Sequence, residues 1–231
     1  MQDRRTHGQR LVAIVGSLLG LLMLVNMAWA DADSAAFRDL SAAWWQWALS
    51  IPASHNPLLD TTGNDCMVGQ RGGRWFLAGF LSGGSATRTC TIPEGTRLFF
   101  PVVNQAFVDT PNQCGQGADS VPLKEMRATV AAIIDGFTTR EATLDGKPIK
   151  DIKRVRSTVF EVALPEDNIF VAFGITPCDA GIYSPTVDDG YYVQLNPLDV
   201  GDHTLVLHAE NPSAGFTLLV TYTLSVVPVA K

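Results

Sequence analysis

The alternation of apolar and polar residues is clearest in the last third of the chain. From Phe216 to Val226 every second residue is apolar, and Thr or Ser fills most positions between them. This period of two is typical of a β-strand with one buried and one solvated face. Further strands are predicted at Tyr191–Leu195 and His203–Ala209, because turn residues such as Asn, Pro and Gly separate these runs. We therefore expect three consecutive antiparallel strands here.

Shorter runs of aromatic and β-branched residues predict strands in the middle of the chain as well. Between Asp65 and Asn104 the expected strands, joined by turns at residues 82–85 and 93–95, are Arg74–Leu81, Ala86–Ile92 and Thr96–Val103. The dipeptide Asp145-Gly146 predicts a tight hairpin between residues 141–144 and 147–149. Two more strands are predicted, at Val155–Leu164 and Ile169–Gly174.

Helical periodicity is found twice. Apolar residues recur at helical spacing after Ser34, a residue suited to cap a helix, until Pro52 ends the run. A second helix is predicted near Ser120, with Pro122 in its first turn and Gly136 at its end. About nine short strands and two helices predict a mainly β protein, an antiparallel β-sandwich of jelly-roll or immunoglobulin-like type with two flanking α-helices.

The first 30 residues have the composition of a secretory signal peptide. Basic residues precede an apolar run from Leu11 to Met27, and Ala28-Trp29-Ala30 provides a small-x-small cleavage site. An uncleaved membrane anchor is the alternative, since roughly 17 apolar residues are just enough to span a bilayer. We expect cleavage after Ala30, a single domain over residues 31–231, and a periplasmic or extracellular location.

The charge of the mature chain argues against a nucleic-acid partner or an anionic membrane surface. Removing Arg4, Arg5, Arg10 and Asp3 from the 17 basic and 23 acidic residues leaves 14 and 22, a formal charge of −8. Phosphate groups require clustered Lys and Arg instead. Contact with a membrane is therefore expected only through the signal segment, if it stays uncleaved.

Four cysteines in an exported chain predict two disulfides. Of the three pairings we favour Cys66–Cys90 with Cys114–Cys178, because the first closes a short loop and the second ties the region around residues 105–120 to the loop before the last strands. Each would contribute on the order of 3 kcal/mol. A zinc site is the rival, but no two cysteines have the Cys-x₂₋₄-Cys spacing.

The sequence contains none of the common catalytic signatures, such as a Gly-x-Ser-x-Gly elbow or a His-Glu-x-x-His pair. His203 and His208 are five residues apart on one predicted strand, so they should point to opposite faces. The paired carboxylates Asp188-Asp189 and Asp199 with Asp202 are expected in neighbouring turns. Such groups bind Ca²⁺ in some loops, or act as an acid and base pair in glycosidases. We predict no cofactor, with calcium as the alternative.

Surplus aromatic residues are the best candidates for ligand contact, namely Trp45, Tyr183 and Tyr192, because their flat faces suit sugars or protein partners. On a helical wheel Trp44 and Trp47 lie within the apolar stripe, whereas Trp45 lies about 100° from its centre, at or beyond the edge. We expect Trp45 to cover the rim of a sheet, with contact to a ligand as the alternative.

Several motifs together resemble a family of secreted bacterial proteins of unassigned function. The resemblance rests on WWQWALSIP at residues 44–52, Cys66 with Gly69-Gln70, WFLAG at 75–79 and LFFP at 98–101. That family has no known catalytic residues to transfer to this chain. We therefore expect an exported, non-enzymatic β-sandwich that binds a glycan or an envelope protein. The alternative is a carbohydrate-active hydrolase or lyase that uses loop carboxylates.

Overall fold

The computed structural model describes residues 34–229. The predicted signal peptide and its cleavage site lie outside these residues. The chain divides into two compact units after Phe37, and the fold and sites described below belong to the second unit. Between residues 34 and 229, none of the helices combines the length and the apolar character needed to cross a bilayer.

Within this part of the chain, the β-strands form two mixed sheets of five strands each. The first sheet has the order β1-β3-β8-β6, with β7 also paired to β8, and the second has the order β2-β10-β9-β4-β5. The strand bounds are β1 (Arg74–Phe76), β2 (Gly84–Pro93), β3 (Arg97–Val108), β4 (Thr139–Leu144), β5 (Lys147–Pro148), β6 (Lys153–Arg156), β7 (Phe160–Leu164), β8 (Gly181–Leu195), β9 (Gly201–Asn211) and β10 (Phe216–Val227). Two packed sheets, as predicted, therefore make up most of the fold.

The prediction that every strand pair is antiparallel is wrong, because each sheet contains one parallel pair. β1 pairs with β3 in parallel, and β2 pairs with β10 in parallel. The physical reason is that consecutive strands alternate between the sheets: β1 and β3 belong to the first sheet, and the intervening β2 belongs to the second. The chain crosses to the second sheet after β1 and back to the first sheet after β2, so β3 runs in the same direction as β1.

Of the three strands predicted at the end of the chain, only the last two form an antiparallel pair. β9 and β10 pair from Asn211 and Phe216 to Gly201 and Val226. β8 instead belongs to the first sheet, where it pairs with β3, β6 and β7. Alternation in β10 is confirmed, since its even-numbered residues from Leu218 to Val226 are buried.

Several predicted element bounds differ from the structure. The strand predicted at 155–164 is divided into β6 and β7, and β1 ends five residues before the predicted Leu81. The segment predicted as a strand at 169–174 begins with a helix, α3 (Ile169–Ala172), because the side chain of Asn168 accepts hydrogen bonds from the backbone N–H groups of Phe170 and Val171. Asx capping of this kind outweighs the β propensity of the apolar run.

The two predicted helices are present. The N-terminal helix covers residues 34–50, and α2 (Leu123–Asp135) starts after Pro122 and ends at Gly136. Two short 3₁₀ helices, η1 (Ala53–His55) and η2 (Pro212–Ala214), complete the helical elements. The predicted hairpin is also confirmed, since Asp145 and Gly146 both have positive φ between β4 and β5.

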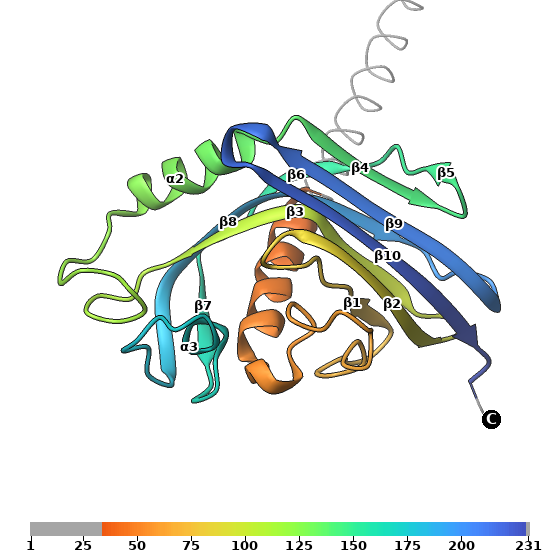
Figure 1. Cartoon of the computed structure of the whole chain (residues 1–231), viewed down its shortest axis with the longest axis horizontal. Coiled ribbons are helices and arrows are strands. Elements are labelled where there is room, and N and C mark those ends of the chain that lie inside the picture. Colours follow the sequence, from red (N-terminus) through yellow and green to blue (C-terminus); the bar gives the residue numbers. More distant parts are fainter. Residues whose placement is uncertain (1–33, 230–231) are drawn as a thin grey trace, which may run out of the picture. The chain divides into compact units, whose positions relative to one another are not determined.

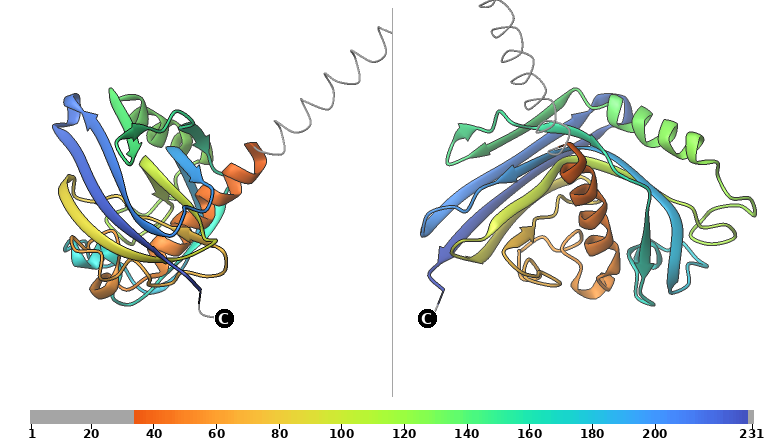
Figure 2. Two further views of the ribbon diagram at one scale, coloured as in Figure 1. Left: turned by 90° about the vertical axis from the view of Figure 1, so that its right-hand side faces the viewer. Right: turned by 180° about the vertical axis from the view of Figure 1, so that it is seen from behind.

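The main core lies between the two sheets, and the first sheet also carries a helix on its other face. Val193 of β8 packs in the core with β9 and β10, whereas its neighbour Tyr192 stacks on Phe99 on the opposite face. The part of the N-terminal helix that follows Phe37 covers this opposite face, crossing β3 and β8 (Figures 1 and 2). β8 is therefore covered on both faces.

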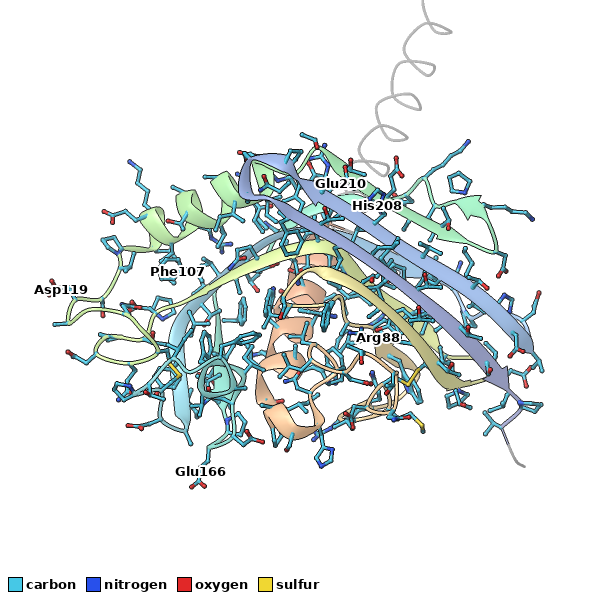
Figure 3. All side chains as sticks on the ribbon, in the orientation of Figure 1. Arg88, Phe107, Asp119, Glu166, His208 and Glu210 are labelled. Carbon is cyan, nitrogen blue, oxygen red and sulfur yellow. A yellow bond between two sulfur atoms is a disulfide. The ribbon has the colours of Figure 1, made fainter. Side chains whose placement is uncertain are left out.

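One buried arginine connects the second sheet to the irregular segment before it. Arg88 of β2 is 1% exposed, and its guanidinium donates to the carbonyl oxygens of Asp60 and Ala78 and to the hydroxyl of Tyr222 (Figure 3). The Tyr222 hydroxyl donates in turn to the carbonyl of Ala78. A charged side chain that donates to several carbonyl oxygens can order a segment that has little regular secondary structure of its own.

Both favoured disulfides are present, Cys66–Cys90 and Cys114–Cys178. The first joins the segment before β1 to β2. The second, whose cysteines have a sequence separation of 64, joins the loop after β3 to the loop before β8. Bonds of this kind persist in an oxidising compartment.

Candidate functional site

A ring of aromatic side chains fills the contact between the N-terminal helix and the first sheet. Trp45 packs edge-to-face on Trp44, with ring centroids 5.0 Å apart, and Trp44 packs in the same way on Trp47. Contacts then continue from Trp47 through Phe76 and Phe99 to Tyr192. Such pairs contribute about 0.5–1.5 kcal/mol each beyond their buried area.

The carboxyl group of Asp188 closes this ring. Its Oδ1 accepts a 2.8 Å hydrogen bond from Trp45 Nε1 and another of 2.8 Å from the Tyr192 hydroxyl. The Asp188 side chain is fully buried, at 0% exposure. Within residues 34–229 its buried Oδ2 accepts no hydrogen bond of good geometry, although the Ser41 hydroxyl lies close enough to lower the pKa of this carboxyl group. Asp188 therefore fixes the orientation of the Trp45 indole from β8.

Burial raises the pKa of Asp188 from 3.8 to about 7, against the opposing effect of the hydrogen bonds from Trp45 and Tyr192. The neighbouring charge of Asp189 raises this pKa further. A carboxyl group with a pKa near neutrality marks a candidate functional position. Arg127 donates to the backbone oxygens of Asp188 and Ser157, and burial lowers the pKa of its guanidinium group.

Asp189 belongs to a charged cluster around β6 and β8 rather than to the aromatic ring. Arg154 donates to both of its carboxylate oxygens, at 2.9 and 3.0 Å, and Arg156 donates to it at 3.2 Å. Arg154 also pairs with Asp135 of α2. Since the carboxylate is matched by two guanidinium groups, this cluster holds α2, β6 and β8 together.

A large cavity lies beside the aromatic ring, with a volume of about 620 Å³. Trp45 and Leu49 of the N-terminal helix form one wall, and β3 forms another with residues that include Phe107. Figure 3 marks Phe107 on β3. The remaining walls come from α3 and the residues after it, and from the loop that carries Cys114. The 114–178 disulfide thus connects two walls of this cavity, which is called the large cavity below.

The lining of the large cavity is mostly apolar and uncharged. Aromatic and aliphatic side chains dominate it, and its polar side chains are Ser82, Gln105, Thr110 and Gln116. Among its lining residues within 34–229 there is no Asp, Glu, Lys, Arg or His. A concave site of this volume, with mainly apolar walls and a few polar groups, has the usual properties of a small-molecule site.

The large cavity is open to solvent next to α3. Ile175 lines it and is 37% exposed, and Phe173 is exposed as well. Val171 of the same segment has nearly the same exposure, 36%, but does not line the cavity. Exposed apolar side chains at the edge of a cavity are consistent with an opening through which an apolar molecule passes.

The structure separates the three aromatic residues predicted to contact a ligand. Trp45 is 5% exposed and Tyr192 is 0% exposed, and the Asp188 carboxyl brings them together. We expected Trp45 to cover the rim of a sheet, but its side chain is buried. Burial is possible at the edge of the helical stripe because Asp188 provides an acceptor for the indole N–H. Tyr183 lies apart, with its hydroxyl donating to the carbonyl of Asp179. Of the three, Trp45 lines the large cavity.

The paired carboxylates also differ from the prediction, since Asp188 and Asp189 lie within β8 and not in a turn. Asp202 accepts a hydrogen bond from the Ser225 hydroxyl, and His203 contacts Asp145 at 2.8 Å. His208 contacts Glu210 at 3.1 Å on the other face of β9 (Figure 3). Over residues 34–229, no three His, Cys, Asp or Glu side chains are grouped so that they could hold a metal ion.

Sequence reasoning missed Asp188 as the residue that holds Trp45, and it missed the cavity walls at Gln105, Phe107 and Ile175. No local signal was available for Asp188. In the run Asp188-Asp189-Gly190 all three residues are depleted in strands, and Asp is rarely buried, so the sequence favours a turn. No local pattern indicates which loops meet to form a cavity.

Comparisons with known proteins identify no family. No protein-family model and no curated protein matches the chain. Among solved structures, the solution structure of amebosin matches with 13% sequence identity and a TM-score of 0.21, over 62% of this chain and 96% of that one. A match at that TM-score carries no argument about fold or function.

Proposed function

We propose that this protein is an exported binding protein that holds a largely apolar small molecule in the large cavity. The observation that carries the proposal is the cavity itself, about 620 Å³ with mainly apolar walls and no charged side chain among its described lining residues. The two disulfides and the composition of residues 1–30 support export to the periplasm or the medium.

Burial of the aromatic faces favours an apolar ligand over a glycan. A sugar ring stacks on a tryptophan or tyrosine face that solvent can reach, whereas Trp45 and Tyr192 are nearly or fully buried. The free energy of binding then comes mainly from apolar surface removed from water, at about 25 cal/mol per Å². The polar lining residues Thr110 and Gln116 bond to each other and to neighbouring residues, so apolar contact carries most of the binding.

A titration with the neutral dye N-phenyl-1-naphthylamine tests the proposal. The dye fluoresces in apolar surroundings, so the exported protein should increase its emission with a saturable binding curve. Ile175→Asp should weaken dye binding by about tenfold or more, because it places a carboxylate at the opening of an apolar cavity.

Val171→Asp is the matched control. It introduces the same charge four residues away, on a side chain of almost equal exposure that does not line the cavity. This variant should bind the dye as the unmodified protein does. The absence of saturable binding, or equal weakening in both variants, would contradict the proposed site.

A further inference from the structure

A second, small cavity of about 190 Å³ lies next to the large one. It is bounded by the end of α2, the β9–β10 connection, and the segment around Gly79. Phe137, Phe216 and Leu218 are among its apolar walls, and Asn104 and Asn211 are its polar lining residues outside the shared wall. This space is called the small cavity below.

Trp45, Leu81 and Gln105 line both cavities. The boundary between the two spaces is therefore formed by these three side chains. Trp45 is held in place by Asp188. The Gln105 side chain donates one hydrogen bond, to the carbonyl oxygen of the adjacent Ala106, and Leu81 is aliphatic. Displacing the Gln105 and Leu81 side chains thus breaks one local hydrogen bond.

The chemistry of the two cavities is alike. As in the large cavity, no Asp, Glu, Lys, Arg or His is among the described residues that line the small one. Burial of an uncompensated ligand charge in such surroundings is strongly unfavourable. The polar lining residues outside the shared wall include Thr110 and Gln116 in the large cavity and Asn211 in the small one.

We infer that the ligand is a neutral molecule with an unbranched alkyl chain, whose chain passes the wall of Trp45, Leu81 and Gln105 into the small cavity. The inference rests on the proposed function, because it concerns the same site. A linear chain is thin enough to pass between three side chains, whereas a fused ring system is not. Each methylene group that the small cavity buries should raise the affinity by roughly fourfold.

Gly79→Leu closes the small cavity without touching the large one. Gly79 lines only the small cavity, and a Cβ added there would lie 3.7 Å from Leu218 Cδ2, an ordinary contact distance. The new side chain therefore has room to occupy that cavity. Gly73→Leu is the matched control, since a Cβ at this exposed glycine meets no atom within 4 Å and the residue lines neither cavity.

The experiment measures displacement of N-phenyl-1-naphthylamine by primary alcohols from hexanol to tetradecanol, with the full exported protein. For the unmodified protein and Gly73→Leu, affinity should rise along the whole series. Gly79→Leu should leave hexanol within about twofold and weaken tetradecanol by about tenfold or more, since it removes the space for several methylenes. Circular dichroism checks that the variants fold, and Ala214→Leu, in η2 on the same small cavity, replaces Gly79→Leu if that variant does not.

The outcomes separate the inference from the proposed function. If the dye binds and Gly79→Leu weakens all alcohols equally, or none of them, the chain does not enter the small cavity and the inference is overturned while the proposed function stands. If neither dye nor alcohol binds to the unmodified protein, the proposed function fails and the inference fails with it.

Discussion

Replacing Asp188 with Asn tests whether the buried carboxyl group titrates near neutral pH. Asn has the same shape, and its carbonyl oxygen can accept the hydrogen bonds that Asp188 Oδ1 now receives from Trp45 and Tyr192. The substitution removes the ionisation and keeps the packing. An amide N–H then takes the place of Oδ2, which adds a cost of about 1–3 kcal/mol that does not depend on pH.

The sign of the effect follows from the pKa of Asp188, which is about 7 in the folded protein instead of 3.8. Between these values the folded state keeps a proton that the unfolded chain has lost. The stability contributed by this group is therefore complete below pH 3.8 and is lost as the pH rises through about 7. At 1.36 kcal/mol for each pH unit, the whole change amounts to roughly 4 kcal/mol.

Urea unfolding of both proteins between about pH 4 and pH 8 measures this change. The free energy of unfolding of Asp188→Asn, minus that of the unmodified protein, should rise by up to roughly 4 kcal/mol across this range. All other titrating groups are shared and cancel in the difference. A difference that stays constant with pH would refute the reasoning.

Asp189→Asn is the control at the adjacent position. It removes the carboxylate that pairs with Arg154 and Arg156, so we expect it to lower the free energy of unfolding at pH 8 by roughly 2 kcal/mol. At pH 8 the two neighbouring substitutions should thus change the free energy of unfolding in opposite directions. If both lower stability equally at pH 8, the environment assigned to Asp188 is wrong.

Three further predictions concern the N-terminus of the mature protein, the buried tryptophans and the disulfide at the large cavity. The mature protein should begin at Asp31, and an intact mass that retains residues 1–30 would contradict this. Trp44→Ala and Trp45→Ala should each lower the free energy of unfolding by about 3–5 kcal/mol, because both side chains are buried; a nearly unchanged thermal midpoint for Trp45→Ala would contradict its position in the core. Replacing both cysteines of the Cys114–Cys178 disulfide with Ala should weaken dye binding by about tenfold, as it disconnects two walls of the large cavity, whereas removing the other disulfide should lower stability and leave dye binding unchanged.

The sequence by itself determined the elements whose signals are local. β9 and β10 follow from a period of two, and α2 follows from Pro122 and Gly136 at its ends. The hairpin at Asp145-Gly146 depends on two residues that tolerate positive φ. In each case the residues that carry the signal are close together in the chain, so a short window contains the information that is needed.

The sequence also predicted both disulfides, because four cysteines leave few alternatives and loop length favours one of them. It predicted two packed sheets from the number of strands. It did not predict which sheet each strand joins, since pairing of β2 with β10 brings together residues more than a hundred positions apart. Local periodicity says which residues share a face and nothing about what that face meets.

Only the tertiary structure decided the position of Trp45 and the character of the candidate site. A helical wheel places Trp45 at the edge of the apolar stripe, but Asp188, 143 residues later, supplies the acceptor that allows its indole to be buried. The large cavity likewise forms where Trp45 and Leu49 of the N-terminal helix lie near β3 and α3, which are far apart in the sequence. Burial is a property of what surrounds a side chain, and for this site nearly all of the surroundings come from distant parts of the sequence.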